Sequence, residues 1–165
     1  MPYAGETNLY CYLPTNVATG LPFIVNADFS LNQKRTSLLN NSWNQFLFKK
    51  IASWSFGFLA KIAKDTMLMP SMLNILPSKE ILNLPSELKS AYQQGYNEGV
   101  AKIAFLPSLE TGKFLSAKEA IVDETGFFHH MQNKLFDPEH KTSKKKLRLV
   151  NPALKNQQQL QQLTQ

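Results

Sequence analysis

The polar side chains best placed for chemistry lie together near the start of the sequence. They follow an apolar run and end in two neighbouring cations, the full set being Asn26, Asp28, Asn32, Gln33, Lys34 and Arg35. Asp28 is, apart from Glu6, the only acidic residue among the first 64, so this group holds no carboxylate pair for general acid–base catalysis. Two cations at the end of a loop are, taken alone, typical of a solvated turn. The group therefore indicates a positively charged loop tip.

The other reactive side chains match no catalytic or metal-binding pattern. Cys11 stands between two tyrosines without a nearby histidine base, which predicts a buried core thiol. A second polar group has spacings that fit no metal-ligand pattern of a helix or strand: His129, His130, Asp137, Glu139 and His140. The seven glycines are scattered and form no phosphate-binding loop. The sequence thus predicts no metal site and no enzyme activity of the chain by itself.

Length and composition favour one compact domain in a reducing compartment. The chain has 165 residues, 43% of them hydrophobic, which suffices for a single core. One cysteine excludes an intramolecular disulfide framework, and no run of about 18 apolar residues predicts a membrane span. We therefore expect a cytoplasmic protein that does not enter a membrane.

Two strands are expected to position the polar group. The first spans Asn8 to Leu13 and ends at Pro14, and the second spans Leu21 to Phe29. The run from Phe23 to Val25 lacks polar alternation, which predicts burial on both faces. The residues from Pro14 to Gly20 are expected to form the loop between the strands, so that the second strand leads to the cationic tip.

A long helix is predicted over residues 43–64, with Asn40, Asn41 or Ser42 as its N-cap. Apolar residues recur every three or four positions, at Trp43, Leu47, Ile51, Trp54, Phe58 and Ile62. This stripe is expected to pack on the sheet, and a helix lying on a membrane surface is the alternative.

The rest of the chain predicts short elements and a tail. Prolines in 67–85 exclude a long helix there, and a helix with Ser86 as N-cap follows. The stretch VAKIAFLPS is expected to be a strand, and TGKFLSAKEAIVD a turn, a short strand and a helix capped by Ser116 with Glu119. The predicted fold class is α/β (α+β), a small mixed sheet backed by helices.

Residues 141–165 are expected to form a separate tail after a domain over residues 1–140. The tail carries six basic and no acidic residues and is rich in glutamine. We expect it to be flexible and loosely ordered, or to be a helix that needs a partner, and to bind polyanions weakly.

The stretch LYCYLPT…TGLPFIVNADFSLNQKRTSL…NSWNQFLFKKIA closely resembles the segment that follows the nucleotide-binding domain in sacsin-like ATPases of the GHKL group, which are related to the heat-shock chaperone. The shared elements are Leu13-Pro14, Thr19 to Pro22, Val25 to Phe29, Arg35 and Trp43-Asn44. A weaker similarity covers TGKFLSAKEAIVD, with Phe114 in place of a tryptophan. The region 65–110 is shorter than in the family.

The resemblance implies a transducer-like middle domain, a two-layer sandwich that senses the γ-phosphate of ATP and reports its hydrolysis. ATP and magnesium are then held by an upstream GHKL nucleotide-binding domain, and a client protein is a further partner. In the family one basic loop residue reaches the γ-phosphate. That role falls here first on Arg35, which matches the family's arginine, and otherwise on Lys34. Asn26 and Asp28 then orient the loop, and Trp43 and Asn44 match the family's motif at the start of the long helix.

A second function is compatible with the residues alone. The apolar helix 43–64 and the basic tail could bind a partner protein or a nucleic acid, without any use of ATP. A small enzyme has no motif in its favour.

Overall fold

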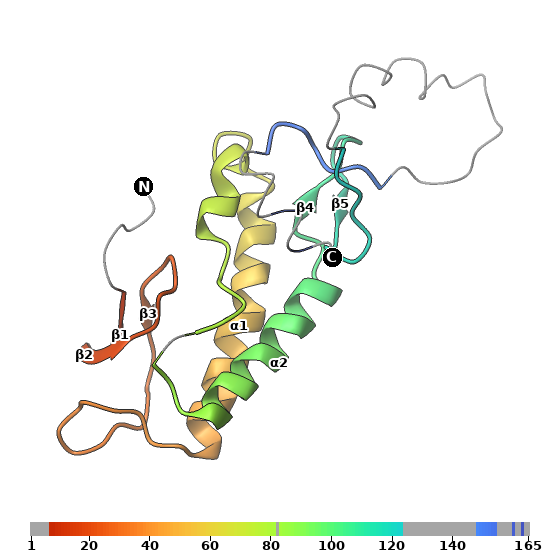
Figure 1. Ribbon diagram of the computed structural model, residues 1–165. Coiled ribbons are helices and arrows are strands. Elements are labelled where there is room, and N and C mark those ends of the chain that lie inside the picture. The colour runs from red at the N-terminus through yellow and green to blue at the C-terminus, as the bar shows by residue number, and fades with distance from the viewer. Residues whose placement is uncertain (1–6, 82, 124–147, 155–159, 161–162, 164–165) are drawn as a thin grey trace, which may run out of the picture.

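The computed structural model describes residues 7–81, 83–123, 148–154, 160 and 163, and these form an α+β fold. Figure 1 shows a small sheet, two long helices side by side, and a second small sheet near the end of the second helix. The elements are β1 (Asn8–Cys11), β2 (Leu13–Ala18), β3 (Val25–Asn26), α1 (Ser42–Ile62), η1 (Met69–Ile75), α2 (Ser86–Lys102), β4 (Leu106–Pro107) and β5 (Phe114–Leu115). The predicted fold class is therefore confirmed, although the strands form two sheets instead of one.

The first sheet has the order β2-β1-β3, with β1 antiparallel to β2 and parallel to β3. The chain turns sharply at Tyr12, whose φ of 62° is left-handed, and enters β2 directly. The prediction of a strand ended by Pro14 and followed by a loop is therefore wrong. Pro14 lies in β2 because this is an edge strand, where a missing backbone N–H leaves no ladder bond unmade. Cys11 is buried, as predicted.

The second predicted strand is reduced to the two residues of β3. Ile24 is 52% exposed and Val25 is only half-buried, so the expected burial of this run is wrong. Leu21 and Phe29, at its two ends, are the residues that enter the core. The reason is that β3 is the other edge of the small sheet, which leaves the side chains between these two anchors at the surface.

The predicted long helix is confirmed as α1, and Asn41 is its N-cap, with its side chain accepting a hydrogen bond from the Asn44 N–H. The predicted core face is only partly right, because Leu47, Ile51 and Ile62 of the stripe are half-buried and pack against the core. The buried residues are Asn44, Phe48, Ala52, Phe56 and Leu59, whereas Trp43, Trp54 and Phe58 of the predicted stripe are exposed. Both stripes repeat every three or four residues, so periodicity could not distinguish them. The packing partner decides which one is buried.

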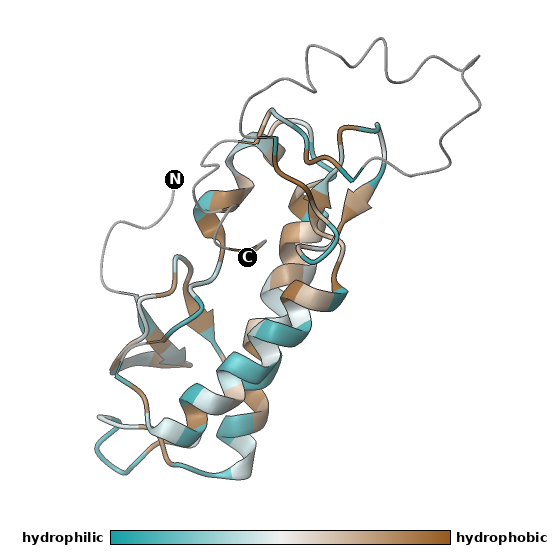
Figure 2. Cartoon of the chain, turned by 45° about the vertical axis from the view of Figure 1, so that its right-hand side comes forward, coloured by the Kyte–Doolittle hydropathy of each residue, from teal (hydrophilic) through white to brown (hydrophobic). Residues whose placement is uncertain are grey.

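That partner is α2, which runs beside α1 in the same direction (Figure 1). It starts at Ser86 with Pro85 at the N-cap position, and no side chain caps it, contrary to the prediction for Ser86. It also continues to Lys102, through residues predicted as a strand. In Figure 2 its outward face is largely hydrophilic. Its inward face carries two buried glycines that let the helices approach closely, Gly95 and Gly99.

The connection between the helices contains the short 3-10 helix η1, in agreement with the prediction of short turns. Beyond α2, β4 and β5 pair antiparallel, and the predicted turn at Thr111-Gly112 joins them. The predicted helix after Ser116 is only one turn, in which the Ser116 hydroxyl donates to Glu119 at 3.0 Å. The serine–glutamate signal therefore predicts a turn correctly but overestimates its length.

The described residues of the predicted tail pack on the body of the chain. Val150 pairs with Ser108 and Leu149 with Ile121, and the Asn151 N–H donates to the Pro107 carbonyl at 2.8 Å. The leucines at 149, 154 and 160 are buried. Residues 149–151 therefore contact residues 107–121, and the separate tail stays a prediction for the rest of 141–165.

Candidate functional site

The cationic residues predicted from the sequence lie at the tip of a narrow loop between β3 and α1. Leu31 and Leu38 form an isolated antiparallel bridge, and the Leu39 N–H donates to the Ser30 carbonyl at 3.0 Å. The loop over residues 30–39 extends away from the sheet, as the orange segment of Figure 1 shows. We call this segment the cationic loop.

Asn32 closes the tip of the cationic loop. Its Oδ1 accepts hydrogen bonds from the Thr36 N–H at 2.8 Å and the Ser37 N–H at 3.3 Å. Its Nδ2 donates to the Thr36 hydroxyl at 2.9 Å. Arg35, with a φ of 56°, takes the left-handed conformation that the tight turn requires. The amide of Asn32 thus imitates backbone pairing across the turn.

The side chain of Arg35 folds back onto the turn between β1 and β2. Its Nη2 donates to the carbonyl of Cys11 at 2.7 Å and to that of Leu13 at 3.4 Å. On the same turn, Asn26 Oδ1 accepts from the Tyr12 N–H at 3.2 Å. The predicted loop-orienting residue Asn26 therefore fixes the β1–β2 turn, and Arg35 joins that turn to the cationic loop.

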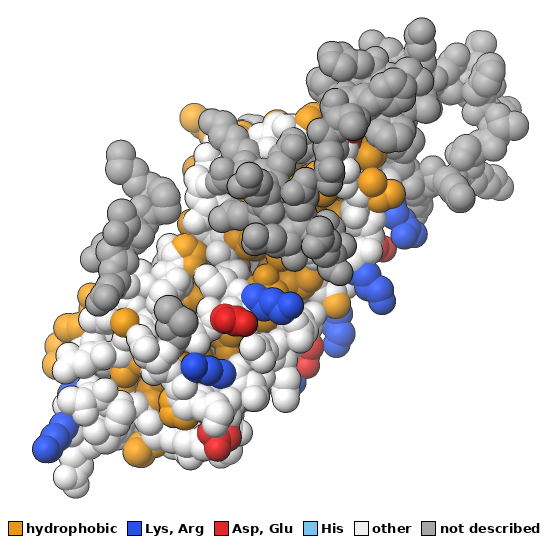
Figure 3. Space-filling view, viewed as in Figure 1, with side chains coloured by type: hydrophobic (Ala, Val, Ile, Leu, Met, Phe, Trp, Pro, Cys, Tyr) orange, Lys and Arg blue, Asp and Glu red, His pale blue; other side chains and the backbone are white. Residues whose placement is uncertain are grey.

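Lys34 differs from Arg35 in being exposed, and it has no hydrogen-bond or ion-pair partner among the described residues. Basic side-chain atoms project from the lower left end of the molecule, over the cationic loop (Figure 3). The sequence has no acidic residue between Asp28 and Asp65. The tip of the loop is therefore a positively charged surface with one cation available for a ligand.

Trp43 and Asn44, at the start of α1, hydrogen-bond to the base of the cationic loop. Asn44 is fully buried, and its Nδ2 donates to the carbonyls of Ser30 and Leu39 at 2.8 and 2.7 Å. Its Oδ1 accepts from the Ser30 N–H at 3.0 Å. Trp43 Nε1 donates to the carbonyl of Asp28 at 2.7 Å, so Asp28 contributes its backbone, and its carboxylate is exposed.

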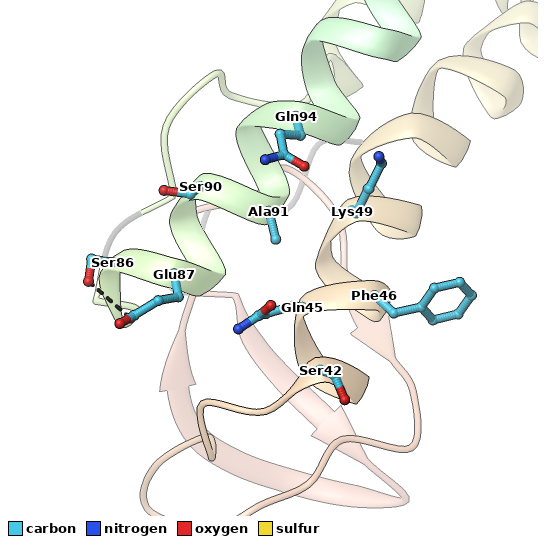
Figure 4. A pocket seen from close by; sticks show the side chains of 9 residues that line it. All are labelled: Ser42, Gln45, Phe46, Lys49, Ser86, Glu87, Ser90, Ala91 and Gln94. Carbon is cyan, nitrogen blue, oxygen red and sulfur yellow. Dashed lines mark hydrogen bonds between the residues drawn. The ribbon is translucent and has the colours of Figure 1, made fainter.

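A polar groove, which the sequence did not predict, lies between the first halves of α1 and α2 (Figure 4). It has a volume of about 560 Å³ and is lined by hydroxyl and amide side chains together with Lys49, which forms an ion pair of 2.8 Å with Glu98. Hydrogen bonds from its own backbone N–H and from Ser86 hold the pKa of Glu87 below its usual value. No sequence signal could reveal the groove, because it exists only where the two helices meet.

The comparisons with known proteins found nothing similar: no family model, no curated protein and no solved structure matches the chain. Within the described residues, no three His, Cys, Asp or Glu side chains gather to hold a metal ion. The helices of that same part are too short or too polar to cross a bilayer. The group for which the sequence predicted no metal binding, at His129, His130, Asp137, Glu139 and His140, lies outside the described residues.

Proposed function

We propose that this chain is a coupling domain that lacks catalytic activity by itself and senses the γ-phosphate of ATP held by a separate GHKL-type nucleotide-binding domain. One observation carries the proposal: an exposed cation, Lys34, lies at the tip of a loop whose base is hydrogen-bonded to the first turn of α1 through Asn44 and Trp43. A displacement at the tip is therefore transmitted to a helix of 21 residues. The choice of the γ-phosphate of ATP as the ligand rests on the resemblance to sacsin-like ATPases.

Lys34 and Arg35 take different parts in this proposal. Lys34 presents its ammonium group to a phosphate oxygen, a point contact that is lost when the phosphate leaves. Arg35 uses only Nη2 for the carbonyls of Cys11 and Leu13. Because a guanidinium has five N–H donors, the remaining ones can bind a second phosphate oxygen. ATP and magnesium belong to the partner domain, and this chain supplies charge stabilisation.

The test is ATP turnover by a sacsin-like nucleotide-binding domain, measured with and without this chain. We expect the chain to raise kcat, and Lys34→Ala to lower the stimulated kcat about tenfold without changing Tm. Lys118→Ala, which removes an exposed cation far along the chain, is the matched control. Arg35→Ala should lower both kcat and Tm, because two backbone carbonyls lose their donor. Stimulation that survives both substitutions in the loop contradicts the proposal.

A second candidate function, binding of a protein or nucleic acid through residues 43–64 and the basic tail, is favoured by the aromatic side chains that α1 leaves exposed. For the nucleic-acid part, removal of the whole tail is a poor test, because Leu154 and Leu160 belong to the core. Replacing the three lysines at 144–146 by glutamine leaves those leucines in place. Salt-dependent binding of DNA or RNA should then weaken, and unchanged binding excludes the tail.

A further inference from the structure

The exposed side of α1 carries a row of aromatic residues interrupted by one cation. Trp43, Phe46, Trp54 and Phe58 all have about half or more of their surface exposed, with Trp54 at 65%. At 100° per residue they fall on one side of the helix, opposite the face that packs on α2. Lys50 lies between them, 5.6 Å from the ring centre of Phe46 and 5.8 Å from that of Trp54. We call these five residues the aromatic face.

The aromatic face borders a hollow instead of a flat surface. Trp54 and Phe58 line an apolar groove of about 360 Å³ together with Ile24, from the exposed run before β3. Figure 4 shows Phe46 pointing away from α2. Exposed aromatic residues that adjoin a groove are typical of sites that bind another molecule.

The surface around Lys50 carries more positive than negative charge, and Glu98 of α2 attracts Lys50 only from beyond 4.0 Å. No acidic residue occurs in α1, and Lys50 has no carboxylate partner within 4.0 Å among the described residues. Lys49, its neighbour, is already paired with Glu98. A complementary partner therefore carries a carboxylate between apolar side chains, so that the carboxylate meets Lys50 while the apolar groups cover the rings.

We propose that the aromatic face binds an acidic, amphipathic helical segment of another protein. The row from Trp43 to Phe58 is about 22 Å long, the length of about four helical turns. Apolar side chains three or four positions apart on the partner helix pack against the aromatic rings of this row. One of these apolar side chains enters the groove beside Ile24. This inference does not depend on phosphate sensing, and it gives the second candidate function a chemical partner.

Two other occupants fit the face less well. A second copy of the chain would bring Lys50 against another Lys50 or another base of α1, which is a like-charge contact. A membrane surface accepts cations at the edge of an apolar helix face, whereas Lys50 stands in the middle of the row and would be carried into the acyl region. A row of aromatic residues with Lys50 in its middle and a groove at one end favours the acidic peptide.

The experiment is a selection from a displayed library of 18-residue helical peptides with the full chain as bait. We expect enriched peptides to be acidic and to repeat apolar residues every three or four positions. Trp43 and Trp54 are the only tryptophans of the chain, so binding should shift intrinsic fluorescence to the blue and protect it from quenching. Lys50→Glu should weaken the selected peptide at least tenfold, and Lys118→Glu should leave it unchanged. Trp54→Ala should abolish binding while circular dichroism remains that of the folded chain.

Each alternative has its own signature. An absence of enrichment, enriched peptides without negative charge, or binding that survives Lys50→Glu overturns the inference. So does tryptophan protection by anionic vesicles in place of peptides, or by a concentration-dependent dimer seen by light scattering. Trp43 also holds the base of the cationic loop. ATP turnover in the Lys34→Ala variant is measured without peptide and is therefore independent of these results.

Discussion

Asn44 is a fully buried polar side chain, and both ends of its amide are hydrogen-bonded to the cationic loop. A buried amide is tolerated only where its donors and acceptor are satisfied, and no buried side-chain atom among the described residues lacks a partner. Asn44 therefore holds the loop in one position relative to α1, which is what a coupling element needs.

Replacing Asn44 by alanine should lower the free energy of unfolding by about 3 kcal/mol, because the backbone groups of Ser30 and Leu39 lose their partners in a buried site. Asn41→Ala, three residues earlier, is the matched control and should cost about 1 kcal/mol, as loss of an N-cap does. Chemical denaturation measures both values. Equal losses for the two variants would show that Asn44 has no special role in holding the loop.

At the scale of elements, the close approach of α1 and α2 depends on two glycines four residues apart. A Cβ on Gly95 would overlap the backbone carbonyl of Lys49, and one on Gly99 would overlap the ring of Phe56. Phe56 in turn packs edge-on against Tyr96, with ring centres 5.1 Å apart. The stretch GYNEG, which forms no phosphate loop, thus serves to pack the helices.

Gly95→Ala should destabilise the fold by about 3 kcal/mol, because the new methyl group meets backbone that cannot move without separating the helices. Gly57→Ala is the control within α1: nothing lies within 4 Å of the added atom, so the higher helix propensity of alanine should stabilise by about 0.5 to 1 kcal/mol. Thermal melts of the two variants should move in opposite directions. A neutral Gly95→Ala variant would contradict the helix contact.

At the scale of the whole molecule, one core joins the first sheet, both helices and the residues near the C-terminus. It runs from Leu9 through Phe48 and Tyr92 to Leu154 and Leu160. Tyr92 is at its centre, where its hydroxyl donates to the Ser78 carbonyl at 2.8 Å. Burial raises the pKa of Tyr92, further assisted by the neighbouring Tyr96, whose pKa burial also raises.

These shifts predict loss of stability in alkaline solution. Both folded-state pKa values lie above the ordinary value of 10.0, so the stabilisation is complete below pH 10 and is lost as the pH rises toward the folded-state values. The free energy of unfolding should fall as the pH rises above 10, and Tyr92→Phe should make this fall shallower. Chemical denaturation of both proteins between pH 8 and 11 measures the two slopes. A fall equally steep in Tyr92→Phe excludes this cause.

The sequence alone predicted the α+β class, the long helix with its asparagine cap, the buried thiol, and the position of the cations on a loop before that helix. These features depend on neighbouring residues: caps, turns and apolar periodicity act within a few positions. Signals from neighbouring residues gave wrong predictions where one local sequence was compatible with two different structures. Pro14 could end a strand or lie in an edge strand, and Ser116 could cap a helix or a single turn.

Tertiary packing decided the rest. Which apolar stripe of α1 is buried depends on the glycines of α2, about 40 residues further along the chain, and periodicity within α1 contains no information about them. The same holds for Arg35, whose guanidinium reaches carbonyls 22 and 24 residues away and so takes a structural role that the loop sequence does not reveal. The sequence placed the charges and the aromatic residues along the chain. Among the described residues, the three-dimensional packing leaves Lys34 without a partner and the aromatic face exposed, because burial is set by the partner surface and not by the residue alone.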